Sequence, residues 1–215
     1  MKDYVLFRGC ITPVRLPAYE AATNIVLEQF GIGLEPLNNA NCCGALYVES
    51  LNENAFLALG GRILALAENA GKDILAVCAA CVGSLKHTKK LLDRRKTARA
   101  EVNELLAEEG LIYSKKVKVK HLLDVFQEDI GLERIESAIT NPYNGIRLAS
   151  HYSCHVTRSF ENLHSGCDDT PTIIDSIIQI AGGIPIDYPE KTRCCGAPIL
   201  AMDEKLAGKV GLNKV

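Results

Sequence analysis

Short apolar runs alternate with longer stretches of helically spaced apolar residues through the first hundred positions. An apolar run from Asp3 to Arg8 predicts a strand, and the stretch from Pro17 to Phe30 then carries Ala, Ile, Val and Leu at helical spacing. The pattern continues as a strand at 33–37, a helix at 53–69, a buried strand at 74–77 and a helix at 82–94. Such alternation is typical of an α/β fold whose parallel strands are joined by crossover helices.

The pattern begins again after a connecting region. Residues 86–109 combine both charges with helix formers, which predicts exposed helices that join two halves or form a partner surface. A strand at 117–121 and a helix at 122–130 follow, and Asn-Pro-Tyr-Asn-Gly at 141–145 predicts a loop. The second half then has a strand at 146–150, a helix at 171–181 and a strand at 184–188. We therefore expect two domains, 1–140 and 141–215, each with a parallel sheet and the second incomplete.

Composition narrows the class of protein. A hydrophobic fraction of 47% and a charged fraction of 23% are ordinary for a packed globular chain, and the net charge of −2 gives no general attraction to nucleic acid. The start lacks the pattern of a secretory signal, and no run has the ~18 apolar residues of a membrane span. We expect a cytoplasmic protein, where clustered cysteines indicate metal binding or catalysis rather than structural disulfides.

Cysteine occurs nine times, and eight of the nine fall into two similar series. The first series reads C-x31-CCG-x33-CxxC and consists of Cys10, Cys42, Cys43, Cys78 and Cys81. The second has a lone cysteine and a CCG triplet but no second CxxC, and consists of Cys154, Cys194 and Cys195. Because each group follows a predicted strand, and ligands gather outside the carboxyl ends of parallel strands, the first five thiols should converge at one edge of a sheet.

Five converging thiolates favour a positive metal centre. Thiolate-only ligation suits an iron–sulfur cluster, and a CxxC at the start of a helix gains from the positive helix terminus. Structural zinc is the alternative, although zinc sites usually combine two close pairs. The adjacent Cys42 and Cys43 reach one site only from a bent backbone, which Gly44 permits, as Gly196 does in the second series. Five cysteines indicate either a spare thiol or an atypical cluster, since a cubane cluster needs four.

Two further residues are candidates for the second series. Cys167 lies in a loop without a counterpart in the first half, where it is either a surface thiol or a substitute ligand. His155 follows Cys154 directly, and its ordinary pKa near the working pH suits proton delivery to a product thiolate. The alternative role for His155 is a hydrogen bond to the backbone or to a cluster sulfur.

The two series, with His-Tyr-x-Cys-His around Cys154 and the segment from Cys194 to Pro198, resemble the cysteine-rich CCG domains in the B-type subunits of heterodisulfide reductases. The resemblance covers essentially the whole chain. It implies a pseudo-twofold pair of Rossmann-like domains that hold two non-cubane 4Fe-4S clusters. It further implies that the first cluster is bound by Cys10, Cys42, Cys43, Cys78 and Cys81, and that Cys154, Cys194 and Cys195 occupy three of five positions around the second.

The resemblance also implies an activity and partners. It implies reduction of a disulfide of the coenzyme M and coenzyme B type to two thiols, with electrons arriving through the C-type iron–sulfur subunit and the A-type flavin subunit of such a complex. The five first-series cysteines and His155 would be the catalytic residues. Full family members are longer, so we expect a C-terminally truncated chain whose second cluster site lacks two ligands. One cluster per chain is therefore expected after anaerobic reconstitution.

Two other functions stay open. Similar CCG domains occur in lactate-oxidising, glycerol-phosphate-oxidising and succinate- or fumarate-linked complexes, which makes an electron-transfer subunit without disulfide chemistry the first alternative. A non-catalytic, zinc-stabilised assembly module is the second. The bound metal separates the second alternative, and the electron acceptor of the full complex separates the first.

Overall fold

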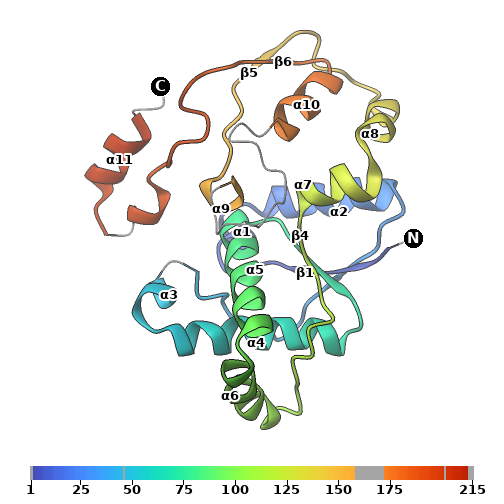
Figure 1. Ribbon diagram of the computed structural model, residues 1–215. Coiled ribbons are helices and arrows are strands. Elements are labelled where there is room, and N and C mark those ends of the chain that lie inside the picture. The colour runs from blue at the N-terminus through green and yellow to red at the C-terminus, as the bar shows by residue number, and fades with distance from the viewer. Residues whose placement is uncertain (1, 46, 158–171, 201, 213–215) are drawn as a thin grey trace. The chain divides into compact units, whose positions relative to one another are not determined.

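The computed structural model describes residues 2–45, 47–157, 172–200 and 202–212 (Figure 1). The chain divides into two compact units, Met1–Leu122 and Leu123–Val215. The expected boundary between residues 140 and 141 lies inside the second unit, and as a boundary between two copies of a CCG domain it stays a prediction.

A four-stranded parallel sheet forms the centre of the first unit. Its strands are β1 (Tyr4–Phe7), β2 (Leu34–Pro36), β3 (Asp73–Ala76) and β4 (Val119–His121), in the order β2-β1-β3-β4. Every neighbouring pair is parallel, and Tyr4 aligns with Leu34 on one side and with Asp73 on the other. The α/β class with parallel strands, expected from the sequence, is confirmed. The sheet grows outward from β1 in two directions, so the edge beside β1 is a topological switch point.

The described helices between these strands are α1 (Thr12–Arg15), α2 (Pro17–Gln29), α3 (Tyr47–Leu51), α4 (Glu53–Asn69), α5 (Ala79–Arg94) and α6 (Lys96–Ala107). The four longer ones match the predicted helical stretches, whereas the short α1 and α3 were not predicted. The Asn52 side chain caps α4 by accepting a hydrogen bond from the Ala55 amide at 3.0 Å. Gly71 ends the helix in a left-handed conformation at φ 68°. Local signals therefore set both limits of α4.

The sheet is buried on both faces, which explains why its strands read as continuous apolar runs. Val5 and Phe7 of β1 belong to the cluster that α4 and α5 cover. Tyr4 and Leu6 point to the opposite face and are also buried. Right-handed crossovers require α2 to cover one face and α4 with α5 the other, and Figure 1 shows α2 and α4 on opposite sides of β1. A core of this kind fixes the strand ends in space.

The prediction that residues 86–109 form exposed helices is wrong in part. Helices form there, but Leu92, Val102 and Leu106 are buried in the core. Helix α6 packs closely against α4 at Gly61, where an added Cβ would lie 2.7 Å from Cγ1 of Val102. Helix α6 can therefore bury Val102 with few apolar residues of its own, because α4 has no side chain at Gly61.

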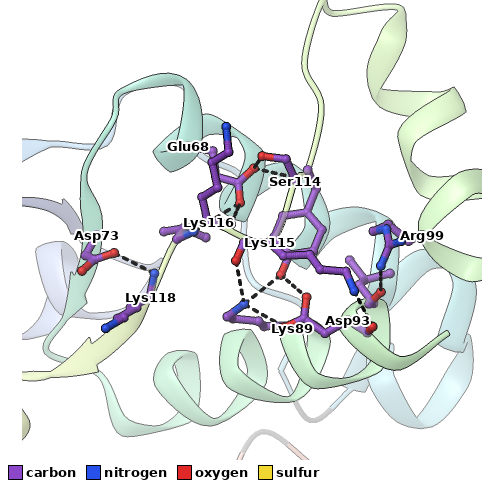
Figure 2. A network of polar contacts seen from close by, with 12 residues as sticks. Glu68, Asp73, Lys89, Asp93, Arg99, Ser114, Lys115, Lys116 and Lys118 are labelled. Atoms are coloured by element: carbon purple, nitrogen blue, oxygen red, sulfur yellow. Dashed lines mark hydrogen bonds and ion pairs between the residues drawn. The ribbon is translucent and has the colours of Figure 1, made fainter. Parts of the chain in front are cut away.

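A polar network fixes the segment between α6 and β4 (Figure 2). The Glu68 carboxylate accepts hydrogen bonds from the amides of Ser114, Lys116 and Val117. On the other side, Tyr113 is buried and donates from its hydroxyl to Asp93 at 2.7 Å. The segment therefore enters β4 with these backbone donors satisfied, although it has no regular structure of its own.

The second unit has a smaller sheet, formed by β5 (Arg147–Leu148) and β6 (Ile184–Pro185) in parallel. Its described helical elements are α7 (Leu122–Val125), which spans the unit boundary, a π-helix (Phe126–Ile130), α8 (Leu132–Ala138), α9 (Cys154–Thr157), α10 (Ile173–Ile180), a 3-10 turn (Ala197–Ile199) and α11 (Glu204–Leu212). The predicted strands at 146–150 and 184–188 are present but short. Across the described ranges, no helix has the length and apolar character needed to cross a membrane.

Candidate thiolate site

The first cysteine series lies at the carboxyl edge of the four-stranded sheet. Cys10 follows β1, the pair Cys42 and Cys43 follows β2, and Cys78 follows β3. Cys81 lies in the first turn of α5. Since all strands run the same way, residues that are far apart in the sequence end at one edge, next to the switch point.

The sulfur atoms of this series meet as a pair and a triplet. Sγ of Cys10 lies 4.0 Å from Sγ of Cys42, and Sγ of Cys43 lies 3.4 Å from Sγ of Cys81. Cys78, three residues before Cys81, is close enough that the Cys78 and Cys81 side chains shift each other's pKa. None of the eight cysteines in the described part of the chain is in a disulfide. The first series is thus brought together as five free thiols.

Burial divides the five thiols into an inner and an outer group. Cys43 and Cys81 are 3% and 4% exposed, and Cys78 is half-buried. Cys10 and Cys42 are exposed. A group bound by all five would therefore be held from the protein side by the triplet and would face outward at the pair.

The three thiols of the triplet differ in pKa. Hydrogen bonding from the Cys81 thiol is the largest effect that lowers the pKa of Cys43 to about 7 and that of Cys78 to about 6, against the opposing effect of burial. At Cys78 the amides of Ala80 and Cys81 at the start of α5 lower the pKa further. The pKa of Cys81 itself is raised far above its usual range, first by its hydrogen bonds to Cys43 and Cys78 and then by burial. The Cys81 thiol therefore favours the thiolate form of Cys43 and Cys78, and thiolates are donors suited to a cationic centre.

Two glycines permit this convergence. Gly9 has φ 68°, and an added Cβ would lie 3.0 Å from Sγ of Cys81. Gly44 has φ 72°, which gives the bend that Cys42 and Cys43 need in order to approach one site. The Ser84 hydroxyl of α5 then holds the turn by donating to the Cys43 carbonyl at 3.1 Å.

Sequence reasoning missed one side chain near the thiols. Tyr19, in the first turn of α2, is 39% exposed, and its pKa is raised by partial desolvation and then by the negative charge of Cys78, so its hydroxyl keeps its proton. Only the position of α2 relative to β3 reveals this proximity, and periodicity does not give that position. A Tyr at this place on an amphipathic helix carries no signal of its own.

The second cysteine series lies on two loops that are longer than their counterparts. Residues 149–153 separate Leu148, the last residue of β5, from Cys154, whereas residues 8–9 separate Phe7, the last residue of β1, from Cys10. The second loop of each unit shows the same difference: residues 186–193 precede Cys194, and residues 37–41 precede Cys42. These long loops lie side by side, because the Tyr152 amide donates to the Lys191 carbonyl at 3.0 Å.

A compact polar cluster braces the two loops. The Ser150 hydroxyl donates to Asp175 at 2.5 Å, and the Lys191 side chain pairs with the same carboxylate at 3.2 Å. The Tyr152 hydroxyl accepts from the amides of Ile174 and Asp175 at the start of α10, at 2.8 and 3.0 Å. Both cysteine loops are therefore tied to the amino end of one helix through largely buried polar groups.

The predicted residues of the second series are only partly connected. Cys194 and Cys195 are exposed, Cys154 is half-buried, and the Cys194 sulfur accepts from the Gly196 amide at 3.4 Å. The backbone amide of His155 donates to the Ser153 hydroxyl at 3.3 Å, and the role of His155 in proton transfer stays a prediction. Cys167 lies outside the described residues. Among the residues that are described, no three or more His, Cys, Asp or Glu side chains surround a single metal-ion position.

An α/β unit with five free thiols at the carboxyl edge of a parallel sheet defines a class of domain whose own cysteine thiolates serve as ligands. A profile of the cysteine-rich domain family named CCG matches residues 4–86 and 148–215, which include both cysteine series. The chain belongs to this family.

Relatives with different names match nearly the same part of the chain. It is 35% identical over 198 residues to the B subunit of the ferredoxin/F(420)H(2)-dependent CoB-CoM heterodisulfide reductase of Methanosarcina acetivorans, covering 92% of the chain and 66% of that protein. It is 27% identical over 195 residues to the 8-methylmenaquinol:fumarate reductase membrane anchor subunit of Wolinella succinogenes, covering 91% and 67%. The chain thus spans about two thirds of the length of these relatives.

The fold also occurs in a solved structure. A hypothetical protein from Helicobacter pylori aligns with 96% of this chain and 36% of its own, at a TM-score of 0.76 and 17% sequence identity. At this identity the likeness concerns the fold alone, and it agrees with the α/β architecture.

Proposed function

We propose that this chain is an iron–sulfur redox subunit in which Cys10, Cys42, Cys43, Cys78 and Cys81 bind a non-cubane 4Fe-4S cluster. The observation that carries the proposal is the placement of five free thiols at one edge of the sheet, with sulfur contacts of 4.0 Å between Cys10 and Cys42 and of 3.4 Å between Cys43 and Cys81. The division into an outer pair and an inner triplet suits a cluster of several irons better than one ion with four ligands. Depressed pKa values at Cys43 and Cys78 favour the thiolate form that such a cluster requires.

The reaction we propose is the reduction of a disulfide, of the coenzyme M and coenzyme B type, to two thiols. The heterodisulfide reductase relative supports this substrate class. The reaction takes up two electrons and two protons, and a bound iron–sulfur cluster supplies electron transfer at the sulfur–sulfur bond. The exposed Cys10 and Cys42 mark the side from which a disulfide would approach, and His155 is our candidate proton donor for a product thiolate.

The assembly we propose has two CCG domains, residues 1–140 and 141–215, in a cytoplasmic complex with the C-type iron–sulfur subunit and the A-type flavin subunit of a heterodisulfide reductase. The second domain contributes Cys154, Cys194 and Cys195 to a further site that has three thiols in this chain. We expect one cluster per chain after reconstitution, because three thiolates on long loops form a weaker site than five on a rigid edge.

Anaerobic reconstitution followed by iron, acid-labile sulfide and electron paramagnetic resonance measurements tests the proposal. Iron with sulfide, and a signal that changes when a thiol substrate is added, is the expected result. Zinc in the purified chain, without visible absorption, would instead indicate a non-catalytic, zinc-stabilised assembly module. Two clusters per chain, with the second lost in Cys167→Ser, would overturn our account of the second site.

A second candidate function is electron transfer without disulfide chemistry. The match to the fumarate reductase subunit favours it, because that relative is similar over nearly the same part of the chain. The complete complex distinguishes the two functions. Turnover of a coenzyme heterodisulfide supports the reductase, whereas reduction of a quinone or fumarate with no disulfide turnover supports the electron-transfer subunit.

A further inference from the structure

The loop that leads into the first CCG triplet has a conformation that needs outside support. Asn39 adopts a left-handed backbone at φ 60°, which a residue other than Gly rarely does. Asn41 then directs its side-chain amide to two carbonyl groups, that of Cys42 at 2.8 Å and that of Leu59 in α4 at 3.1 Å. The backbone of the first CCG cysteine is thus fixed to α4 through one Asn side chain.

Arg62 of α4 holds both ends of this loop. Its Nη1 donates to the Asn39 carbonyl at 2.7 Å and to Oδ1 of Asn41 at 3.0 Å. Its Nε and Nη2 donate to the two carboxylate oxygens of Glu109, just beyond α6, at 2.7 and 2.6 Å. One planar guanidinium therefore binds a carboxylate on one edge and the loop on the other. The Arg62 side chain is 22% exposed and that of Glu109 is 47% exposed, so the geometry of the planar fork, and not burial, distinguishes this network.

We propose that Arg62 is a positioning residue for the first thiolate site. It acts through Asn41, whose orientation it fixes, on Cys42, the exposed thiol that faces Cys10. Glu109 in turn keeps the guanidinium plane aligned with the loop. The proposal rests on the proposed function only in naming the bound group as an iron–sulfur cluster, because the restraint on the loop belongs to the metal-free chain.

Arg62→Lys is the informative variant. Lysine keeps the positive charge but has no planar fork, so it cannot bind Glu109 bidentately and the loop at the same time. Arg95→Lys is the matched control, because Arg95 also pairs with both oxygens of a glutamate, Glu53, in α4, and it lies outside the network that holds the cysteine loop. Asn41→Ala removes the link between Arg62 and Cys42 directly.

Backbone amide relaxation, measured by NMR on the full metal-free chain, reports the restraint itself. We expect the order parameters of the amides of residues 41–43 to fall from about 0.85, the value of rigid backbone, to below about 0.6 in Arg62→Lys and Asn41→Ala, because the loop loses side-chain hydrogen bonds that fix it. The same order parameters should be unchanged in Arg95→Lys, and the core strands should stay rigid in all three variants. Unchanged order parameters at 41–43 in Arg62→Lys overturn the proposal, whatever metal the chain binds.

The reconstituted chain gives the second readout. With equal iron content, Arg62→Lys should change the electron paramagnetic resonance signal and the midpoint potential of the cluster, while Arg95→Lys should match the wild type. A signal and potential identical to wild type in Arg62→Lys overturn the positioning role at the cluster. A wild-type chain that takes up no iron contradicts the proposed function instead, and the order parameters of residues 41–43 still decide the role of Arg62.

Discussion

The two units hold their cysteines by different physical means. In the first, a sheet buried on both faces fixes the strand ends, and short loops carry the thiols from them. In the second, a two-stranded sheet supports longer loops, and the Ser150, Asp175 and Lys191 cluster ties those loops together. One ligand pattern is therefore positioned by apolar packing in one copy and by buried hydrogen bonds in the other.

The strongest contrast between the units concerns the cofactor. Cys81→Ser removes the thiol that contacts both Cys43 and Cys78, so bound iron and sulfide should fall at least about tenfold. Cys154→Ser should leave most of the iron in place, because the first series is untouched. Metal analysis after anaerobic reconstitution measures both. An equal loss in Cys154→Ser would mean that the two series bind one cofactor jointly.

Deletion of core volume should affect the first unit next most strongly. Leu92→Ala removes a fully buried side chain from the α5 face that packs in the core, and should lower the free energy of unfolding by about 2–5 kcal/mol. Leu105→Ala on α6 is the control, because Leu105 is 60% exposed and its loss should cost less than about 0.5 kcal/mol. Urea unfolding checks both values. Similar costs for the two variants would contradict burial of this region.

The two CCG glycines should differ in their sensitivity to a methyl group. An added Cβ at Gly196 would lie 2.5 Å from the Ala207 carbonyl oxygen, whereas at Gly44 it would meet side chains of Leu59 and Val48 at 3.3 Å. Gly44→Ala should cost about 1–2 kcal/mol from its left-handed backbone, and Gly196→Ala about 2–4 kcal/mol because backbone must also move. Hydrogen exchange within each unit measures them separately. A larger cost at Gly44 than at Gly196 would show that α11 can shift to accommodate the methyl group with little loss of stability.

A weaker effect is expected at the polar cluster of the second unit. Asp175→Ala leaves both Ser150 and Lys191 without their shared carboxylate, and should destabilise the second unit by about 1–3 kcal/mol. Asp187→Asn is the control, since Asp187 pairs with the same Lys191 but is 92% exposed, and less than about 0.5 kcal/mol should be lost. Hydrogen exchange of the 150–154 amides follows both. Equal exchange in the two variants would contradict the bracing role of the polar cluster.

The strands of the first unit could be predicted because the central ones are uninterrupted apolar runs. Tyr4–Phe7 lies within its predicted strand, Asp73–Ala76 begins one residue before its own, and the cysteine groups follow strands as expected. Residues 86–109 were harder, since burial of Val102 depends on Gly61 and not on a broad apolar face. The apolar pattern of α6 alone does not reveal that α4 has a glycine, and so no side chain, opposite Val102.

The site was predictable as a set of cysteines and not as an environment. Spacing was enough to bring the first five thiols to one edge, but neither Tyr19 nor Arg62 has a signal in the sequence. Arg62 acts on Cys42 through a loop carbonyl and an Asn side chain, and such contacts follow only from the packing of α4. The polar cluster of Ser150, Asp175 and Lys191 could not be predicted either, because its members come from three separate segments of the sequence.

The left-handed glycine that closes each CCG triplet bears on which positions of such a domain can change during evolution. Gly44 and Gly196 share a positive φ in two units whose sheets and loop lengths differ. This backbone requirement is independent of any bound metal, since it comes from the turn itself. A descendant domain that had lost its thiols would still be more stable with the glycine than without it. We therefore expect cysteine at these positions to vary with the bound cofactor among related domains, and glycine to persist for as long as the turn does.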